Sequence, residues 1–392
     1  LMSIVSLSGV DGIGKSEQIA LLRSHPQVRY GGPLTQYSDK WPKLSPADHF
    51  EWWFKRVPFE RFLDLVIESL NERRHQVIGG FVNVQDRGER MFKAVCVATL
   101  LTRESTVGFS DATRIVDSAF KSGLAHEEGK EILLVREERY GLNASVLNEA
   151  NKLERESPFS TEQNNTYSKY QSYLSVALDH YTAGEECRKV QVDSCILSVQ
   201  NELRAILSEM TATTLPALCG DLEELVVFSG LSECGKSSFA QTLHDRKGFY
   251  RLKIKYFRHL ATRHNAGKDT REAIGHELVR FLDDHAHIRQ VTLESLHGPE
   301  LGLHLKALFG NRCKVVFISA PERLRIERLS QQLKISEADA TVIVREKDAL
   351  KISCGIENVI AFADVLFENS GSDFETAFES FHSVLRSKLK AG

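Results

Sequence analysis

The stretch that decides the fold of the first half of the chain is Gly9-Val10-Asp11-Gly12-Ile13-Gly14-Lys15-Ser16. It matches the pattern Gly-x-x-x-x-Gly-Lys-Ser/Thr, follows a short apolar run at 4–7, and precedes a helical pattern at 17–23. The glycines let backbone N–H groups point at phosphate oxygens, while the lysine neutralises those oxygens and the serine hydroxyl can hold Mg²⁺. The pattern therefore predicts a phosphate-binding loop between a strand and a helix.

The same pattern recurs in the second half as Gly230-Leu231-Ser232-Glu233-Cys234-Gly235-Lys236-Ser237. An apolar run at 225–228 precedes it, and a helical segment from Ser238 to Leu243 follows. Two matches, each between a strand and a helix, favour nucleotide binding over glycine turns that never meet a ligand. The residues expected to hold ATP are Gly9, Asp11, Gly12, Gly14, Lys15, Ser16, Gly230, Gly235, Lys236, Ser237, Ser238 and Asn369. Ser16 and Ser237 are the expected ligands of Mg²⁺.

Length and composition bound the class of protein. The chain has 392 residues, which at about 150 residues per domain predicts two or three domains. Hydrophobic residues make up 42% and charged residues 26%, which is typical of a folded globular protein. The net charge is −3, so we expect no nucleic-acid partner, although a local basic groove would be compatible with this balance.

Membrane and redox signals point to a cytoplasmic protein. No apolar run reaches the ~20 residues needed to cross a bilayer, and residues 1–3 open no secretory signal, so we expect no membrane partner. The seven cysteines are odd in number and include no Cys-x-x-Cys pair. We therefore expect free thiols in a reducing compartment rather than a zinc ribbon or a disulfide scaffold.

A stretch of small residues and proline at 211–217 separates the two halves. It follows a helical segment at 197–210 and has no periodicity, which is typical of a linker. We predict one domain at 1–210, a linker at 211–223 and a second domain at 224–392. Strands alternate with helices in both halves, so the expected class is α/β, with two parallel sheets that each have helices on both faces.

Several segments of the first half share a pattern. An aromatic and basic helical segment spans 52–74 and contains Arg56, and a predicted strand at 76–85 leads into Asp86 and Arg87. Further predicted strands lie at 132–135 and 188–194. Together with the wording of the first loop, these segments resemble the thymidylate kinase family of nucleoside monophosphate kinases over nearly all of residues 3–210. The resemblance implies that 52–74 crosses the acceptor site and that the exit of 188–194 contacts adenine.

The resemblance assigns roles to three residues of this half. Asp86 would orient Mg²⁺ waters or the acceptor, while Arg87 and Arg56 would clamp the phosphate of the acceptor, which arginine does better than lysine. Two positions depart from the family pattern, because Ser8 replaces an acidic residue and Gly88 replaces an aromatic one. The resemblance also implies an arginine in the lid. Its position in the family falls near Asn143 of this chain, which leaves Lys152 and Arg155 as the candidates. The acceptor is therefore not fixed as dTMP.

The second half resembles dephospho-CoA kinase and adenylate kinase, another branch of the same superfamily. The strand at 314–320 and the arginine-rich helix after it resemble the family segment that precedes the lid, which implies that Arg325 and Arg328 cover the transferring phosphate. The segment 363–372, which contains Asn369, resembles the closing strand and its adenine-contacting turn. Glu294 ends a predicted strand where the family places its acidic catalytic residue.

Other readings of these residues stay open. Arg56 would pair with Glu60 on a solvated helix face if it had no functional role. The aromatic residues Phe50, Trp52, Trp53, Phe54, Phe59 and Phe62 are favoured as core over a base-stacking surface. Pro58 is expected to break the helix at 52–74, and Ser45 with Pro46 to begin one. The histidines at 285–287 are favoured as a solvated loop over a metal site.

The sequence thus predicts a phosphotransferase that uses Mg²⁺ and ATP to phosphorylate a nucleoside monophosphate, dTMP-like or modified. The catalytic residues expected are Lys15, Asp86, Arg87, Arg56, Lys236, Glu294 and Arg328. Two loops favour two consecutive phosphorylations, and the family resemblance implies a homodimer. Two alternatives remain: one active domain beside a degenerate regulatory one, or a nucleotide sensor that transfers no phosphate.

Overall fold

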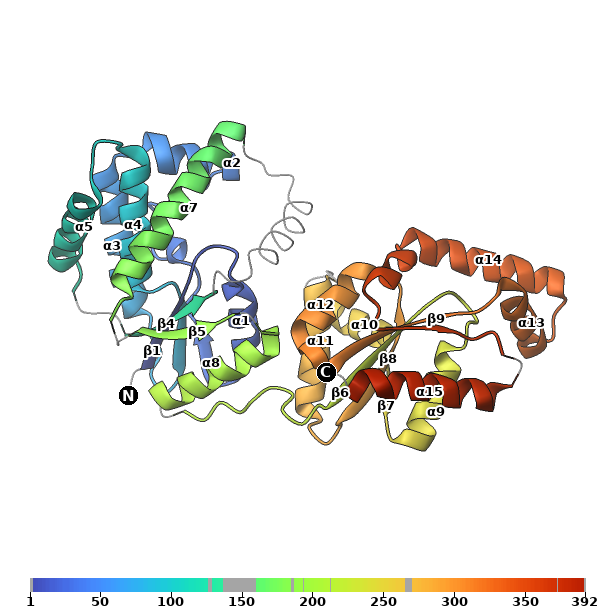
Figure 1. Cartoon of the computed structure of the whole chain (residues 1–392). Helices are drawn as coiled ribbons and strands as arrows, with labels where there is room; N and C mark the ends of the chain where they lie inside the picture. Colours follow the sequence, from blue (N-terminus) through green and yellow to red (C-terminus); the bar gives the residue numbers. More distant parts are fainter. Residues whose placement is uncertain are drawn as a thin grey trace. The chain divides into compact units, whose positions relative to one another are not determined.

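The computed structural model describes residues 3–125, 129–136, 160–184, 187–192, 194–211, 213–264, 270–371 and 373–390. By its internal contacts the chain divides into two units. Unit 1 consists of Leu1–Ser194 and Val199–Pro216, and unit 2 of Cys195–Ser198 and Ala217–Gly392. Both units are visible in Figure 1 as strands flanked by helices.

Unit 1 contains a parallel sheet of five strands in the order β2-β3-β1-β4-β5. Its elements run β1 (Ser3–Ser8), α1 (Lys15–Leu22), β2 (Val28–Tyr30), η1 (Leu34–Gln36), α2 (Pro46–Glu51), η2 (Trp52–Arg56), α3 (Phe59–His75), β3 (Val82–Asp86), α4 (Glu89–Arg103), α5 (Phe109–Gly123), β4 (Lys130–Val135), α7 (Thr161–Tyr181), β5 (Cys187–Gln191) and α8 (Ile196–Thr211). The strand that leads into the first glycine loop is the central one.

Apolar side chains cover both faces of this sheet. On one face, residues of β1 and β3 pack with Ile19 of α1 and with Leu203 and Leu207 of α8. On the other face a second cluster joins α3, α4, α5 and α7, with Phe62 and Leu174 fully buried in it. Helices therefore lie on both faces, as the alternation of strands and helices predicted.

Two predicted elements of unit 1 are corrected by the structure. The strand expected at 76–85 begins only at Val82, because α3 continues to His75 and Gly80 turns with φ 82°. The amide of Asn83 closes that turn by hydrogen bonds to both backbone groups of Ile78. The helix expected at 52–74 is interrupted, since η2 is a π-helical turn and α3 starts after Pro58. Pro58 ends the turn as predicted, because proline cannot continue the hydrogen-bond ladder.

Unit 2 contains a second parallel sheet of five strands, in the order β10-β9-β6-β8-β7. Its elements run β6 (Glu224–Ser229), α9 (Lys236–Lys247), β7 (Tyr250–Lys253), α10 (Ile254–His264), α11 (Arg271–Asp284), β8 (Gln290–Leu296), α12 (Pro299–Phe309), η4 (Gly310–Arg312), β9 (Cys313–Ser319), α13 (Glu322–Leu333), α14 (Glu337–Ser353), η5 (Ile356–Phe362), β10 (Val365–Glu368) and α15 (Phe374–Lys390). The strand before the second glycine loop is again central.

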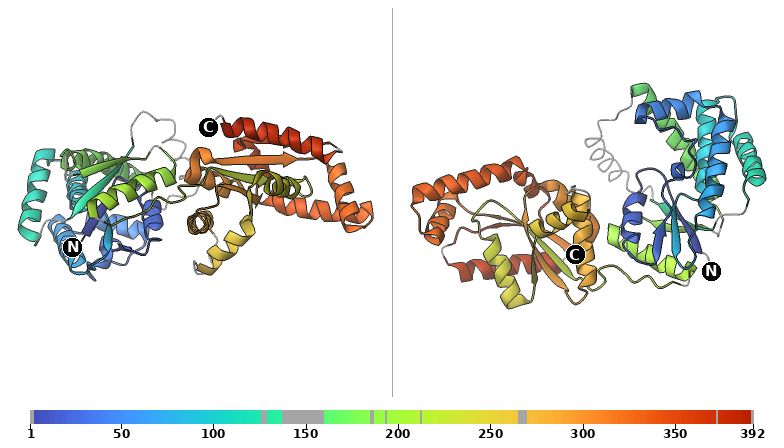
Figure 2. Two further views of the ribbon diagram at one scale, coloured as in Figure 1. Left: turned by 90° about the horizontal axis from the view of Figure 1, so that it is seen from below. Right: turned by 180° about the vertical axis from the view of Figure 1, so that it is seen from behind.

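The core of unit 2 is rich in phenylalanine on one face of its sheet. Phe239 of α9 stacks on Phe381 of α15 with ring centroids 4.8 Å apart, and both pack on Phe228 of β6. Helix α12 contacts β8 and β9, and α10 contacts β8. The views in Figure 2 show helices on both sides of these strands. The predicted α/β class, with two parallel sheets covered on both faces, is confirmed.

Two smaller expectations also have an outcome. All seven cysteines are free, as their number and spacing predicted. Among the described residues, no helix combines the length and the apolar character that a membrane crossing requires.

Candidate functional site

The glycine loop of unit 2 wraps tightly at the end of its central strand. Gly230 has φ 131°, and a Cβ there would lie 2.1 Å from the carbonyl oxygen of Ile318 on β9, so no larger residue fits. The ammonium group of Lys236 folds back onto the loop and donates to the carbonyls of Gly230, at 2.9 Å, and of Leu231. The loop thus holds the ammonium group of its lysine against its own backbone carbonyls.

Glu294 of β8 is buried beneath this loop and is fully engaged. Its side chain is 1% exposed. One carboxylate oxygen accepts from Ser237 Oγ at 2.6 Å, and the other accepts from Arg251 Nε of β7. The sequence predicted that this strand ends at Glu294. It ends instead at Leu296, and the β6–β8 pairing contains a bulge. Ser295 has φ 75° at this bulge.

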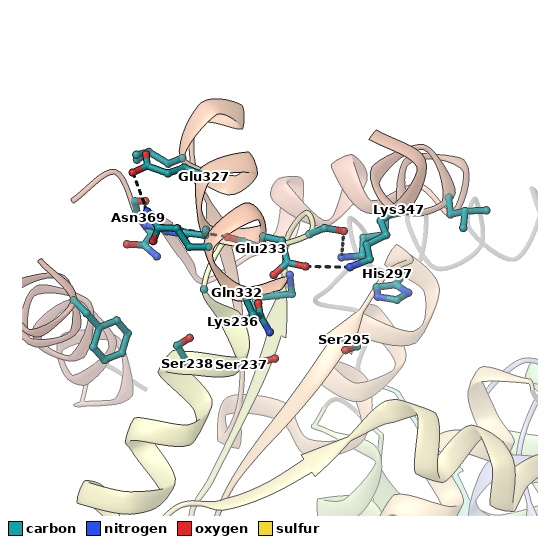
Figure 3. Close-up of a pocket in the computed structure, with 18 of the residues that line it drawn as sticks. Glu233, Lys236, Ser237, Ser238, Ser295, His297, Glu327, Gln332, Lys347 and Asn369 are labelled. Atoms are coloured by element: carbon teal, nitrogen blue, oxygen red, sulfur yellow. Dashed lines mark hydrogen bonds and ion pairs between the residues drawn. The ribbon is translucent and has the colours of Figure 1, made fainter. Parts of the chain in front are cut away.

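A cavity of about 1040 Å³ opens in front of the loop. Figure 3 shows side chains from the loop, from the end of β8 and from helices α13 and α14 around it. The polar and charged residues that line the cavity include Ser232, Glu233, Lys236, Ser237, Ser238, Ser295, His297, Glu327, Arg328, Lys347, Lys351 and Asn369. The predicted residues Lys236, Ser237, Ser238, Arg328 and Asn369 therefore share one cavity.

The two arginines expected to cover the phosphate differ in the structure. Arg328 lines the cavity and donates to the backbone oxygens of Glu233 and Asn369, at 3.5 and 3.3 Å. Arg325 is 5% exposed, because its guanidinium forms an ion pair with Asp348 of α14 and also donates to Ser232 O. Arg325 therefore braces the loop from behind instead of covering the cavity.

Asn369 follows β10 and contacts the loop directly. Its amide nitrogen donates to the carbonyl of Cys234 at 2.9 Å, and the side chain is 4% exposed. A Cβ at Gly235 would lie 2.5 Å from that amide nitrogen, so the glycine makes room for this contact. Asn369 thus ties the closing strand to the phosphate loop.

The α14 side of the cavity concentrates positive charge. Lys351 donates to Ser232 Oγ at 2.9 Å, and its pKa is lowered to about 8 by burial and by the nearby charge of Lys236. Burial together with Lys351, Lys236 and Arg258 lowers the pKa of His297 to about 4. An anion placed among these groups would stabilise the protonated lysines. The electrostatics of this wall favour a phosphate-bearing ligand.

The glycine loop of unit 1 has the same geometry. A Cβ at Gly9 would lie 2.9 Å from Leu134 O of β4, and Lys15 Nζ donates to the carbonyls of Gly9 and Val10 at 2.6 and 2.9 Å. Burial and the charge of Arg87 lower the pKa of Lys15 to about 8. The hydroxyl of Ser16 is on an exposed residue at the start of α1.

Asp11 in this loop is bound by three side chains. Arg87 Nη2 donates to one of its carboxylate oxygens at 2.6 Å, and Tyr167 Oη and Gln171 Nε2 of α7 donate to the other at 2.8 and 3.1 Å. Burial raises the pKa of Asp11, but Arg87, Tyr167, Lys15 and Gln171 together bring it below its ordinary value. We call Asp11, Arg87, Tyr167 and Gln171 the Asp11 cluster.

Among the described residues, neither Asp86 nor Arg56 donates a hydrogen bond to Asp11. Asp86 ends β3, and its buried Oδ1 atom has no hydrogen-bond partner among the described residues. Arg56 is exposed at the end of η2 and, within the described chain, forms no ion pair with Glu60. The lid candidates Asn143, Lys152 and Arg155 lie outside the described residues.

An aromatic pocket of about 220 Å³ lies beside the Asp11 cluster. Its lining residues are Asp11, Pro46, His49, Phe50, Trp53, Phe54, Arg87, Tyr167 and Tyr170. Phe62, by contrast, is fully buried in the core of this unit, and Trp52 packs against it. The aromatic residues therefore divide into a core group and a pocket group, which the sequence pattern alone did not separate.

The two positions that depart from the thymidylate kinase pattern meet in the structure. Ser8 Oγ donates to the buried carboxylate of Glu131 on β4 and accepts from the backbone N–H of Gly88 at 3.0 Å. A Cβ at Gly88 would lie 2.6 Å from the carboxyl carbon of Glu131. Glu131 thus brings an acidic group to Ser8 from the neighbouring strand, and Gly88 leaves the space it needs.

The metal preferences of the site follow from its donors. In the described part of the chain, no group of three or more His, Cys, Asp or Glu side chains is arranged to hold a metal ion, and the segment 285–287 is no exception. The joined oxygens of Ser237 and Glu294 instead suit Mg²⁺, which takes few protein ligands and retains water and phosphate oxygens. Ser237 and Glu294 are the residues that would hold it in unit 2.

Sequence reasoning missed several residues of the unit 2 cavity. Lys347 and Lys351 lie four residues apart on α14, so both follow one helix face, a spacing that is visible in the sequence. His297 follows the predicted strand at 291–294 by three residues, and proximity to a strand end was its only signal. Arg251 gave no signal, because its contact with Glu294 depends on strand pairing.

Comparisons with known proteins add little to this picture. No protein-family model matches the sequence, and no curated protein sequence matches it. Similar solved structures include a shikimate kinase from Bacteroides thetaiotaomicron (12% identity, TM-score 0.28, 42% of this chain and 98% of that one). A dephospho-CoA kinase from Campylobacter jejuni matches at 18% identity and TM-score 0.24, over 43% of this chain and 98% of that one. An uncharacterized protein from Eubacterium ventriosum matches at 11% identity and TM-score 0.33, over 42% and 99%.

Proposed function

We propose that this chain is a Mg²⁺- and ATP-dependent phosphotransferase and that unit 2 carries out phosphoryl transfer. The observation that carries the proposal is the convergence of Lys236, Ser237 and Arg328 on one cavity of about 1040 Å³, with buried Glu294 bound to Ser237 behind its wall. Phosphoryl transfer requires mainly positioning and cations that spread the charge of the moving group. These residues supply both requirements.

In this proposal each residue of unit 2 has a distinct task. Lys236 leaves the loop carbonyls and contacts the β- and γ-phosphates, and Arg328 reaches the transferring group from α13. Ser237 and Glu294 hold Mg²⁺, which when bound neutralises phosphate oxygens and fixes their geometry. Asn369 holds the loop closed behind the phosphates through its bond to Cys234 O.

For unit 1 we propose a nucleoside monophosphate as the acceptor, dTMP-like or modified, so that the chain performs two consecutive phosphorylations. The aromatic pocket of about 220 Å³ supports this, because its rings can stack on a base beside Arg87, which would grip a phosphate after leaving Asp11. Arg56 would join the grip only if η2 moved, since it does not line this pocket.

A second candidate function is that unit 1 binds nucleotide and regulates unit 2 without transferring phosphate. The specific observation in its favour is that the guanidinium of Arg87 is already paired with Asp11, 2.6 Å away, and so is not free to grip a phosphate. In this alternative the same loop would bind ATP, and the acceptor pocket would serve only recognition.

The test is ADP release with a panel of nucleosides and nucleoside monophosphates, on the wild type and on Lys15→Ala and Lys236→Ala. We expect Lys236→Ala to lower the turnover number by at least about 10²-fold, the usual effect of removing one charge-stabilising donor. Lys247→Ala and Lys43→Ala change exposed lysines of the same two units and should leave turnover unchanged.

The pattern of losses separates the candidates. Loss of one acceptor activity in each loop variant supports two working sites. Loss only in Lys236→Ala supports a single working site, in unit 2. Tight ATP binding without any acceptor-stimulated ADP release in the wild type would contradict the proposal.

A further inference from the structure

The contacts of Glu294 limit which side chain of unit 2 can take a proton from a bound acceptor. The inference that follows rests on the proposed phosphoryl transfer by unit 2. Both oxygens of Glu294 are engaged, one by Ser237 and the other by Arg251, and the side chain is 1% exposed. The carboxylate therefore fixes the hydroxyl of Ser237 and the guanidinium of Arg251. Because Glu294 does not line the cavity, its carboxylate is not directed at an acceptor there.

His297 is placed where an acceptor would lie. Ligands of parallel α/β sheets bind beyond the carboxyl ends of the strands, and His297 directly follows the end of β8, the neighbour of the central strand. The left-handed residue Ser295 breaks the strand pairing, and both Ser295 and His297 line the cavity. In Figure 3 they lie on the β8 side of the cavity that also holds Lys236.

The charged groups around His297 keep it neutral in the free protein. Lys236 of α9, Lys351 of α14 and Arg258 of α10 act on it, and with burial they lower its pKa to about 4. A bound triphosphate would offset these cations and raise the pKa of the imidazole toward neutrality. The imidazole is therefore unprotonated before ATP binds, and it becomes a better base once ATP is bound.

The charge of the cavity matches one triphosphate rather than two phosphate ligands. Its lining carries four cationic side chains, Lys236, Arg328, Lys347 and Lys351, against two carboxylates, Glu233 and Glu327. Lys347 is itself paired with Glu233 at 3.2 Å. The surplus of positive charge is small, so little remains for a second phosphate after Mg²⁺ and ATP bind.

We propose that His297 is the general base of unit 2 and that its acceptor is a carbon-bound hydroxyl group rather than a phosphate. The imidazole takes the hydroxyl proton as the acceptor oxygen forms a bond to the γ-phosphorus of ATP. The bond from that phosphorus to the β–γ bridging oxygen breaks, ADP leaves, and the imidazolium returns its proton to water. A phosphate acceptor is already ionised near neutral pH and requires no base.

The first test follows the His297 imidazole by NMR on the full chain, with His297→Gln used to assign its signal. We expect its pKa to rise by at least one unit when a non-hydrolysable ATP analogue and Mg²⁺ saturate the protein. The exposed His287 is the internal control and should not move. A His297 pKa that the analogue leaves unchanged would overturn the proposal.

The second test uses the Lys15→Ala background, so that only unit 2 turns over, with ATP and a panel of nucleosides and nucleoside monophosphates. We expect ³¹P NMR of the product to show a phosphate monoester. His297→Gln should lower kcat by about 10²-fold or more and leave KM for ATP within about twofold. The matched variant His287→Gln should retain wild-type turnover.

The outcomes separate this inference from the proposed function. A phosphoanhydride product, or full activity of His297→Gln, overturns the role of His297 while phosphoryl transfer by unit 2 stands. Absence of any transfer in the Lys15→Ala background, together with absence of ATP binding, overturns the proposed function and this inference with it.

Discussion

The two units of this chain share a backbone plan more closely than their sequences suggest. In each, the central strand precedes the glycine loop, and strand order and direction are the same. The partner of Leu7 on the neighbouring strand is Asp86, and the partner of Phe228 is Glu294. Leu7 and Phe228 both lie two residues before the first loop glycine. The two carboxylates therefore occupy one equivalent position.

The equivalence extends to an unusual backbone conformation. The residue after each carboxylate has a positive φ, 66° at Arg87 and 75° at Ser295. Such angles are uncommon outside glycine and cluster at functional sites. The same turn thus directs a guanidinium toward Asp11 in unit 1 and places a serine on the cavity wall in unit 2.

The side chains around the equivalent carboxylates are what differ. Arg251 of β7 donates a hydrogen bond to Glu294 in unit 2. The equivalent residue of β2 in unit 1 is Tyr30, because each of the two pairs with the residue that lies two positions before the carboxylate on the neighbouring strand. Asn369 contacts the loop of unit 2, and the equivalent residue after β5 is Val192, which has no amide to offer. One backbone plan therefore carries differently connected loops in the two units, with Arg251 and Asn369 bound around the loop of unit 2.

Removing the charge of the equivalent carboxylates, Glu294 and Asp86, should have the largest effect and should show how far the two units differ. Glu294→Gln, in the Lys15→Ala background, should weaken the Mg²⁺ dependence of ATP turnover and lower kcat by about 10²-fold, because a neutral amide holds a cation poorly. Asp86→Asn in the Lys236→Ala background should have a smaller effect, since no hydrogen bond joins Asp86 to Ser16 among the described residues. Mg²⁺ titration of both variants measures the difference.

Equal losses in the two variants would contradict the comparison. In that case Asp86 would hold the cation of unit 1 as directly as Glu294 does in unit 2. The contact between the serine and the carboxylate would then not distinguish the sites.

The second prediction concerns the pH dependence of ATP affinity in unit 1, where we expect a change of about tenfold. The pKa of Lys15 is lowered to about 8, so above that pH the free protein loses the charge that would bind a triphosphate. A bound anion raises this pKa, so ATP binding takes up a proton at alkaline pH. In the Lys236→Ala background, we expect affinity for ATP to fall about tenfold between pH 7 and pH 9. Calorimetry at both pH values measures it.

Lys15→Arg is the matched control for this pH effect. Arginine keeps its charge over the whole interval, so the affinity of that variant should be nearly independent of pH. A wild-type loop with constant affinity from pH 7 to pH 9 would show that Lys15 is fully charged without a ligand.

The elements of the site that follow from local sequence were predictable. Both loops combine a fixed spacing of glycines with a strand before and a helix after, and such signals lie within about twenty consecutive residues. The residues that complete the loops are different, because they come from distant strands and helices. Asn369 was found only through a family resemblance, and Arg251 reaches Glu294 only because β7 pairs with β8.

Burial explains the predictions that need revision. Arg325 and Arg328 lie one turn apart on α13, and the sequence does not show that Asp348 binds the first of them. Likewise, Ser8 and Gly88 read as two separate departures from a family pattern. The structure joins them through Glu131, a contact that depends on the order of the strands.

The smallest effect tests whether the Asp11 cluster restrains Arg87. Tyr167→Phe removes the hydroxyl that donates to Asp11 at 2.8 Å, which loosens the carboxylate and lets Arg87 leave it more often. A hydrogen bond of this kind contributes about 0.5–1.5 kcal/mol, so we expect acceptor-stimulated ADP release by unit 1 to rise about threefold in the Lys236→Ala background. Tyr173→Phe changes the same helix without touching Asp11 and is the matched control. If Tyr167→Phe lowers the rate instead, the cluster holds Arg87 in its working position, and the regulatory reading of unit 1 loses its main support.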